Sequence, residues 1–167
     1  MPLLKGSHQV EDTWTPVEDI EALPESGPAI VPLELWESAR AHLMGRNQPL
    51  GVRLKNDQSL ERIAEDIPHF ALVALEFPKF SDGRAYSQAT LLRDRYGFTG
   101  EVRAVGAVKR DQAQFMKRCG FDTFEVPTQA EADAWAEALS RYDLAYQPAP
   151  DGAAPVFRRR HPRAAVE

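Results

Sequence analysis

The chain has 167 residues, of which 27% are charged, with a formal net charge of −5 and a single cysteine, Cys119. This length suits one domain with a sizeable core, and a lone cysteine excludes an intrachain disulfide and any all-cysteine zinc or iron–sulfur site within one copy. We find no apolar run long enough to cross a bilayer and no secretory leader, so we expect a cytoplasmic protein without a membrane partner.

The charges are distributed unevenly along the chain. Residues 1–37 contain eight acidic residues and one lysine, whereas the C-terminal end is basic. We expect an acidic N-terminal arm over 1–31, an α/β domain over 32–147 and a disordered Pro/Ala/Arg-rich tail over 148–167. The run Arg158 to Arg163 is typical of a solvated tail, with a phosphate-binding arm as the alternative; the acidic balance of the chain makes nucleic acid a poor partner.

Hydrophobic periodicity predicts helices alternating with strands in the central domain. The expected helices run from Pro32 to Gly45, from Ser59 to Pro68, from Ala85 to Tyr96, through Phe115, Met116 and Cys119, and from a capping box at Thr128 to Leu139. The expected strands are Leu50 to Lys55, Phe70 to Phe77, Glu101 to Gly106 and Thr123 to Val126.

Two of the expected helices end in the same four-residue pattern, Arg95-Tyr96-Gly97-Phe98 and Arg118-Cys119-Gly120-Phe121. A glycine that follows an apolar-periodic run and precedes a hydrophobic residue is typical of a Schellman C-cap, because glycine adopts a left-handed conformation without steric cost. The repeated pattern indicates a chain built from βα units.

The two faces of the expected strands differ in polarity. One face is apolar throughout: Leu50, Val52, Leu54, Val73, Leu75, Phe77, Val102, Ala104, Gly106, Phe124 and Val126. The opposite face carries one charged side chain near the middle or end of each strand, in the order Arg53, Glu76, Arg103 and Glu125. A doubly wound sheet needs two apolar faces. The pattern therefore predicts an α/β fold in which four sequential parallel strands form half of a (βα)₈-like barrel, with helices on one face and a polar concave face.

This polar row has two interpretations. Its alternating charges on neighbouring strands could form cross-strand ion pairs that solvate an open sheet face. They could also belong to a ligand site, since parallel-sheet enzymes bind substrates at the C-terminal ends of their strands, where Glu76 is the candidate general acid or base.

The loops at those strand ends supply further candidates. Free backbone N–H groups at helix N-termini, together with basic side chains, form a pocket suited to sulfate, sulfite or phosphate. The candidate ligand-binding residues are Lys79, Asp82, Gly83, Arg84, Arg103, Gly106, Arg110 and Asp111. Asp82 and Asp111 have a second interpretation as helix N-caps, with the arginines paired to them.

Other chemistry lacks its usual sequence signals. Cys119 falls at a helix C-terminus, where the dipole disfavours a thiolate, so we interpret it as a buried packing thiol. The four histidines show no metal-ligand spacing, and the chain contains no G-x-G-x-x-G after a strand and no P-loop. We therefore expect no metal site and no nicotinamide, flavin or nucleotide cofactor.

Three stretches carry a resemblance to a known family: Phe77 to Ser87 (FPKFSDGRAYS), Gly100 to Gly106 (GEVRAVG) and Arg110 to Asp122, with its RDQ and RCGFD motifs. The chain resembles, over about residues 10 to 147, a bacterial family of unknown function that is labelled as an oxidoreductase of sulfite reduction and is encoded beside assimilatory sulfite reductase. The resemblance implies a role in sulfur assimilation and cysteine biosynthesis. It brings no catalytic residues with it.

Sulfite reduction to sulfide requires many electrons and a redox cofactor, for which this sequence has no motif. We therefore expect an accessory protein that docks on sulfite reductase or its electron donor, through its polar concave face or its acidic N-terminal arm, or that binds the oxyanion for the enzyme. One alternative is a small enzyme in which Glu76 acts on an anionic substrate held by Lys79, Arg84 and Arg110. The other is a structural dimerisation module, because uncovered strands invite a homodimer.

Overall fold

The structure, a computed structural model, describes residues 1–142 and 144–160. Its strands are β1 (Leu3–Lys5), β2 (His8–Val10), β3 (Thr15–Pro16), β4 (Ala29–Pro32), β5 (Leu50–Leu54), β6 (Leu72–Phe77), β7 (Glu101–Gly106) and β8 (Thr123–Glu125). Its α-helices are α1 (Leu33–Met44), α2 (Arg84–Asp94), α3 (Ala113–Arg118), α4 (Gln129–Ser140) and α5 (Val156–Arg160). Short 3-10 helices are η1 (Ile20–Ala22), η2 (Leu60–Ile63), η3 (Ile67–His69) and η4 (Arg110–Gln112).

All eight strands join one sheet in the order β2-β1-β8-β7-β6-β5-β4-β3. The strands from β3 to β8 pair in parallel, and β1 pairs antiparallel with both β8 and β2. The predicted α/β class and half-barrel sheet are confirmed, and the four predicted strands correspond to β5, β6, β7 and β8. The description as four sequential βα repeats is incomplete, because four more strands extend the sheet at its two ends.

The crossover between β5 and β6 also differs from the predicted helix. Ser59 caps its start by accepting a hydrogen bond from the Glu61 N–H, but the segment forms the 3-10 turns η2 and η3 instead of an α-helix. Pro68 lies only nine residues after Ser59, and a proline removes a backbone donor and blocks the preceding helical turn. Pro68 therefore prevents one regular helix from continuing through this segment, although its apolar residues Leu60, Ile63 and Ile67 are buried as expected.

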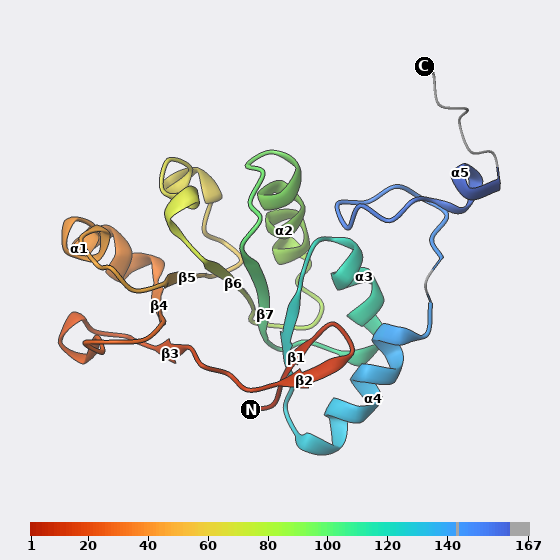
Figure 1. The fold of residues 1–167 in the computed structure, drawn as a ribbon, viewed down its shortest axis with the longest axis horizontal. Coiled ribbons are helices and arrows are strands. Elements are labelled where there is room, and N and C mark those ends of the chain that lie inside the picture. Colours follow the sequence, from red (N-terminus) through yellow and green to blue (C-terminus); the bar gives the residue numbers. More distant parts are fainter. Residues whose placement is uncertain (143, 161–167) are drawn as a thin grey trace.

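The sheet is strongly curled, because a short connection joins strands at its two opposite edges. The order places β2 and β3 seven strand spacings apart, which would be about 34 Å across a flat sheet. Only residues 11–14 connect them, and the five steps from Val10 to Thr15 reach at most about 17 Å. The two edges must therefore approach each other, and Figure 1 shows the red N-terminal segment passing from β2 to β3 along the open side of the sheet.

Alternate residues of the strands lie in two separate hydrophobic clusters. The larger cluster contains the predicted apolar face, including Val52, Val73, Leu75 and Phe124, together with the buried residues of α1, α2, α3 and α4. The smaller cluster, on the concave face, consists of Ile30, Leu72, Ala74 and Val105, with Trp14 packed against it. Helices thus cover the convex face, and the N-terminal segment lies over the small apolar patch of the concave face.

The glycine pattern that closes two βα units is confirmed. Gly97 and Gly120 have φ values of 60° and 105°, in the left-handed region that favours glycine. The following phenylalanines donate backbone hydrogen bonds into the last helical turns, Phe98 to the Leu92 carbonyl and Phe121 to the Met116 carbonyl. These caps end α2 and α3 and direct the chain into β7 and β8.

The C-terminal region extends away from the body of the protein at the end nearest α4 (Figure 1). Residues 161–167 of the predicted disordered tail lie outside the described residues. Within the described part, Asp151 pairs with Arg118 of α3 at 2.7 Å, and α5 follows. Every helix of the described residues is too short or too polar to span a bilayer.

Candidate functional site at the C-terminal ends of β7 and β8

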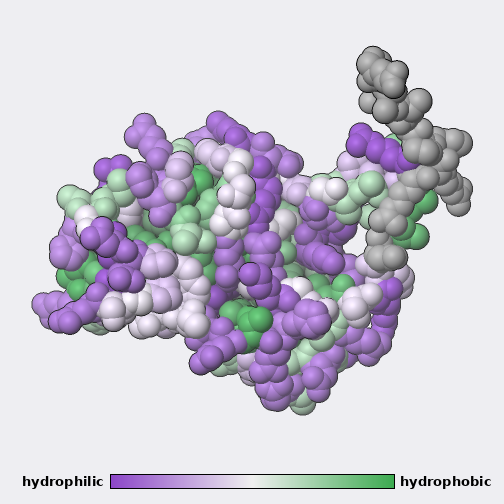
Figure 2. All heavy atoms as spheres, viewed as in Figure 1, coloured by the Kyte–Doolittle hydropathy of each residue, from purple (hydrophilic) through white to green (hydrophobic). Residues whose placement is uncertain are grey.

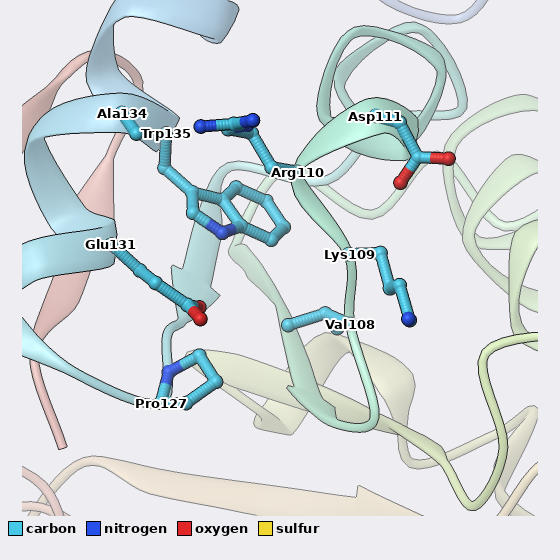
Figure 3. Close-up of a pocket in the computed structure, with 8 residues that line it drawn as sticks. All are labelled: Val108, Lys109, Arg110, Asp111, Pro127, Glu131, Ala134 and Trp135. Carbon is cyan, nitrogen blue, oxygen red and sulfur yellow. The ribbon is translucent and has the colours of Figure 1, made fainter.

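A pocket of about 570 Å³ opens at the C-terminal ends of β7 and β8, between the loop that follows β7 and the first turns of α4. Figure 3 shows the residues that line it: Val108, Lys109, Arg110, Asp111, Pro127, Glu131, Ala134 and Trp135. This is the end of a parallel sheet where ligands bind in barrel enzymes. The sequence placed the candidate ligand site at this end of the sheet, in the loops after β6 and β7. The pocket is instead formed by the loops after β7 and β8.

The loop after β7 depends on Gly106, the last residue of that strand. Gly106 has a φ of 89°, and a Cβ there would lie 2.6 Å from the Phe77 carbonyl oxygen. The chain then turns tightly, with the Ala107 N–H donating to that same oxygen at 2.7 Å and the Val108 N–H donating to the Gly106 carbonyl at 2.8 Å. This turn brings Lys109 and Arg110 to the mouth of the pocket.

The opposite wall belongs to α4, whose start the sequence predicted as a capping box. Thr128 caps the helix, and its hydroxyl accepts a hydrogen bond of 3.3 Å from the Glu131 N–H. Trp135 lies one turn further along, is only 1% exposed, and packs on Phe124 with ring centroids 5.7 Å apart. The indole therefore forms a fixed wall of the pocket, close to the positive end of a twelve-residue helix.

The basic side chains of the pocket have no acidic partner in the part of the chain that the structure describes. Figure 3 shows Arg110 turned towards α4 beside Trp135, and Asp111 turned away from the indole. The Lys109 ammonium lies 4.6 Å from the centroid of the Phe80 ring, a cation–π contact with the neighbouring loop after β6. The Glu131 carboxylate also faces the pocket in Figure 3, so the lining contains two basic side chains, Lys109 and Arg110, and two acidic ones, Asp111 and Glu131.

The candidates in the loop after β6 lie outside this pocket. The Arg84 guanidinium donates two hydrogen bonds to the Asp82 carboxylate, at 3.0 and 2.7 Å, and these bonds lower the pKa of Asp82 to about 2. Asp82 also accepts from the Arg84 N–H at 3.3 Å, so it caps the start of α2 from the position before Gly83, the N-cap residue. Lys79 is exposed in the same loop. The donors of Arg84 are thus largely engaged.

The polar row does not form the continuous ladder of one predicted interpretation. Arg53 pairs at 2.6 Å with Glu18 of the N-terminal segment, not with Glu76. The strand register explains why: Arg53 and Arg103 both lie opposite Ala74, whereas Glu76 lies one pleat further, opposite Val105. Of the neighbouring pairs in the polar row, only Arg103 and Glu125 form an ion pair, with 3.7 Å between Nη1 of Arg103 and Oε1 of Glu125.

Arg103 is the most buried charged residue of that row, with a side chain 1% exposed. Its Nε donates to Glu101 at 2.9 Å and its Nη1 to Asp12 at 2.8 Å, while Nη2 has no partner among the described residues. Burial opposes the charged form of Arg103, but the contacts with Asp12 and Glu101 outweigh it and raise the pKa. Burial also raises the pKa of Glu125, against the opposing attraction of Arg103.

Sequence reasoning missed the acids that the N-terminal segment brings to this face. Asp12 and Glu18 are remote in sequence from Arg103 and Arg53. The one sequence signal for these ion pairs was the excess of acidic residues in 1–37, which could neutralise arginines on the strands. Sequence reasoning also did not single out Trp135 or Glu131 as residues of a site. Neither residue carries a local motif that distinguishes a pocket wall from a helix core.

Cys119 is buried, at 8% exposure, and burial raises the pKa of its thiol. This confirms the prediction of a packing cysteine. Within residues 1–142 and 144–160, no group of three or more His, Cys, Asp or Glu side chains could hold a metal ion.

Comparison with known proteins gives a family and no described activity. Residues 51–157, nearly two thirds of the chain, match the family described as "bacterial protein of unknown function (DUF934)". The matched region runs from β5 to α5 and includes both walls of the pocket. No curated protein matches the chain. The chain belongs to the bacterial family DUF934.

Proposed function

We propose that this protein is a cytoplasmic accessory protein of assimilatory sulfite reduction, which binds a small oxyanion such as sulfite in the pocket at the ends of β7 and β8. It would dock on sulfite reductase or on that enzyme's electron donor. The observation that carries the oxyanion part is the presence of Lys109 and Arg110 at the pocket without an acidic partner among the described residues. The pathway part comes from the resemblance to the family encoded beside sulfite reductase.

The chemistry of the pocket supports an anion in preference to a neutral ligand. An arginine guanidinium can donate two parallel hydrogen bonds to an oxyanion, and a lysine adds a point charge. The N-terminal half of α4 borders the pocket, and the helix dipole adds a favourable partial positive charge there. Glu131 limits the affinity by repulsion, which suits a ligand that must be released to an enzyme.

An accessory role is supported over autonomous catalysis by the electron requirement. Reduction of sulfite to sulfide consumes several electrons, which a flavin, siroheme or cluster normally delivers. The chain has one cysteine, and burial keeps it in its neutral thiol form. The electrons would therefore pass through the partner enzyme.

The alternative of a small enzyme depends on Glu76. This residue is partly exposed near the C-terminal end of β6 and faces the concave side, where it has no ion-pair partner among residues 1–142 and 144–160. Arg84, its proposed substrate-holding partner, already binds Asp82. We therefore rank catalysis by Glu76 second.

Growth tests separate the two functions. A bacterium in which the gene is deleted should grow on sulfide but not on sulfate or sulfite as sulfur source. The wild-type gene and Glu76→Gln should restore growth, whereas the double variant Lys109→Gln/Arg110→Gln should not. Rescue that fails with Glu76→Gln in a folded protein would favour the enzyme, and a deletion strain that grows on sulfate would contradict the pathway assignment. The tagged protein, isolated from cells that assimilate sulfate, should retain sulfite reductase or its electron donor.

A further inference from the structure

Five large apolar side chains are exposed together on one end of the protein. They are Phe115, Tyr142, Leu144, Tyr146 and Phe157, with exposed fractions between 45% and 78%. Phe115, Tyr142 and Leu144 line one groove, Phe115 and Tyr146 line the next, and the rings of Tyr146 and Phe157 lie 6.5 Å apart. We call these five residues the aromatic patch. A contiguous exposed apolar patch is typical of an association surface.

Most of the patch belongs to residues 144–160, which we call the C-terminal arm. The arm is folded on itself by a hydrogen bond of 2.9 Å from the Val156 N–H to the Ala145 carbonyl. Its polar links to the body come from Arg118, which binds Asp151 and the Gln147 carbonyl. No described residue of the arm belongs to the main hydrophobic core. The arm thus has a local structure but leaves its aromatic side chains uncovered.

The charge of the arm matches that of a distant part of the same chain. Three consecutive arginines, from 158 to 160, lie at the end of the arm. The loop from Glu18 to Glu25 contains four acidic residues, all exposed. Figure 1 places this loop and the arm at opposite ends of the long axis, so the two cannot meet within one copy.

A second copy removes that separation. When two elongated molecules lie side by side in opposite directions, each arm faces the acidic loop of the other, and a twofold axis makes the two contacts identical. Apolar side chains accompany the charges at both places: Figure 2 shows green residues on the arm, and the acidic loop contains Ile20 and Leu23. Ile20 and Leu23 in the loop are only partly buried against the core.

We propose that the C-terminal arm docks on the acidic loop, residues 18–25, of a second copy of this chain, which forms an antiparallel twofold dimer. The aromatic patch supplies the apolar contact, and Arg158 pairs with the acidic residues of that loop. This surface is separate from the oxyanion pocket, so the proposal does not depend on the proposed function.

Light scattering after size exclusion tests the dimer with the full chain. At 50 to 100 mM salt the Debye length is about 10 to 14 Å, so charges in direct contact across an interface are only weakly screened. The protein should be dimeric under these conditions, and high salt should weaken the dimer. The double variant Tyr146→Ser/Phe157→Ser and the double variant Glu21→Lys/Glu25→Lys should each weaken dimerisation at least tenfold. Leu91→Ser, which removes an exposed apolar side chain from α2, is the matched control and should remain dimeric. All variants should keep the wild-type melting temperature of the monomer, because the substituted residues are exposed.

A disulfide trap tests which surfaces meet. In a Cys119→Ala background, Ser26→Cys and Ala154→Cys place thiols at exposed positions beside the acidic loop and in the arm, without removing a proposed contact. The double-cysteine protein should form a covalent dimer closed by two disulfides, whereas each single-cysteine protein should not. A monomer at all concentrations and salts, a dimer that survives both double variants, or efficient crosslinking by Ala154→Cys alone would overturn the proposal; the last result would mean that the arms meet each other.

Discussion

Arg103 and Asp12 are ninety-one residues apart in the chain, yet the Nη1 atom of Arg103 lies 2.8 Å from the Asp12 carboxylate on the concave face of the sheet. This contact, with Trp14 over the neighbouring apolar patch, fastens the segment that joins the two edges of the curled sheet. The N-terminal segment therefore lies across the concave face of the open half-barrel, and Arg103 is the buried residue that anchors it there.

Loss of that arginine should be costly. Arg103→Met should lower the free energy of unfolding by about 3 kcal/mol, because Glu101, Asp12 and Glu125 lose the buried cation that they share. Urea unfolding followed by circular dichroism measures this. The matched control is Arg53→Met, whose ion pair with Glu18 is exposed and should contribute less than about 1 kcal/mol. Equal losses in the two variants would contradict the role assigned to Arg103.

Glu125 should give a distinct pH dependence. Its pKa is raised in the folded state, chiefly by burial, so the folded protein favours the protonated carboxyl more than the unfolded chain does. Stability is therefore lost as the pH rises from the unfolded-state pKa through the folded-state pKa. Glu125→Gln should be more stable than wild type at pH 7, and the difference should disappear as the pH falls below both values. Unfolding curves across this pH range check the sign, and a variant less stable than wild type at pH 7 would be inconsistent with it.

The carboxylate of Asp66 supports the packing of α1. It accepts a hydrogen bond of 3.0 Å from the indole N–H of buried Trp36 and two from Arg40, at 2.9 and 2.5 Å. Asp66→Ala should cost about 2 kcal/mol, because the indole N–H is left buried without a partner. Glu65→Ala, an exposed neighbour, serves as control and should have little effect on the melting temperature. Arg40 holds the pKa of Asp66 below its ordinary value, so this stabilisation should be lost as the pH falls through that lowered value.

Gly106 links the strand to the candidate site. Gly106→Ala should destabilise the protein by about 2 kcal/mol, because the left-handed φ is strained for alanine and the new Cβ would meet the Phe77 carbonyl. It should also weaken anion binding by shifting Lys109 and Arg110. In Gly45→Ala, where the nearest atom is 3.4 Å from a Cβ and φ is negative, both effects should be small. Thermal unfolding with and without sulfite measures the two effects together, and unchanged binding in Gly106→Ala would show that the turn does not position the site.

Much of the central fold could be predicted because local signals agree there with tertiary structure. The alternation along β5, β6 and β7 separates the two faces correctly, and the glycines at 97 and 120 mark the ends of α2 and α3. Strand β4 was missed because its last residue, Pro32, directly precedes α1. A proline at that place is typical of the first turn of a helix, so the sequence indicated a helix start there and not a strand end. Strands β1, β2 and β3 have only two or three residues each, too few for a periodic signal, and they exist because neighbouring strands pair with them.

The candidate site was predicted only in part, for a geometric reason. Sequence order indicates which residues follow a strand, so Arg110 and Asp111 were found beside the pocket. It does not indicate which loops converge in space. In the loop after β6, Phe80 lies against Lys109, whereas Arg84 is already paired with Asp82 and does not reach the pocket. Partners for Arg53 and Arg103 came from a segment that only the curl of the sheet brings near.

The most direct test of the central claim is calorimetric titration of the full-length protein with sodium sulfite, with sulfate and phosphate as comparisons. We predict saturable binding that Arg110→Gln weakens by about tenfold, the effect of losing one charge-assisted hydrogen bond of about 1.4 kcal/mol. Arg95→Gln, which removes an exposed arginine remote from the pocket, should bind as wild type does. Equal binding by Arg110→Gln and wild type, or no binding of any of the three anions at millimolar concentration, would contradict the account.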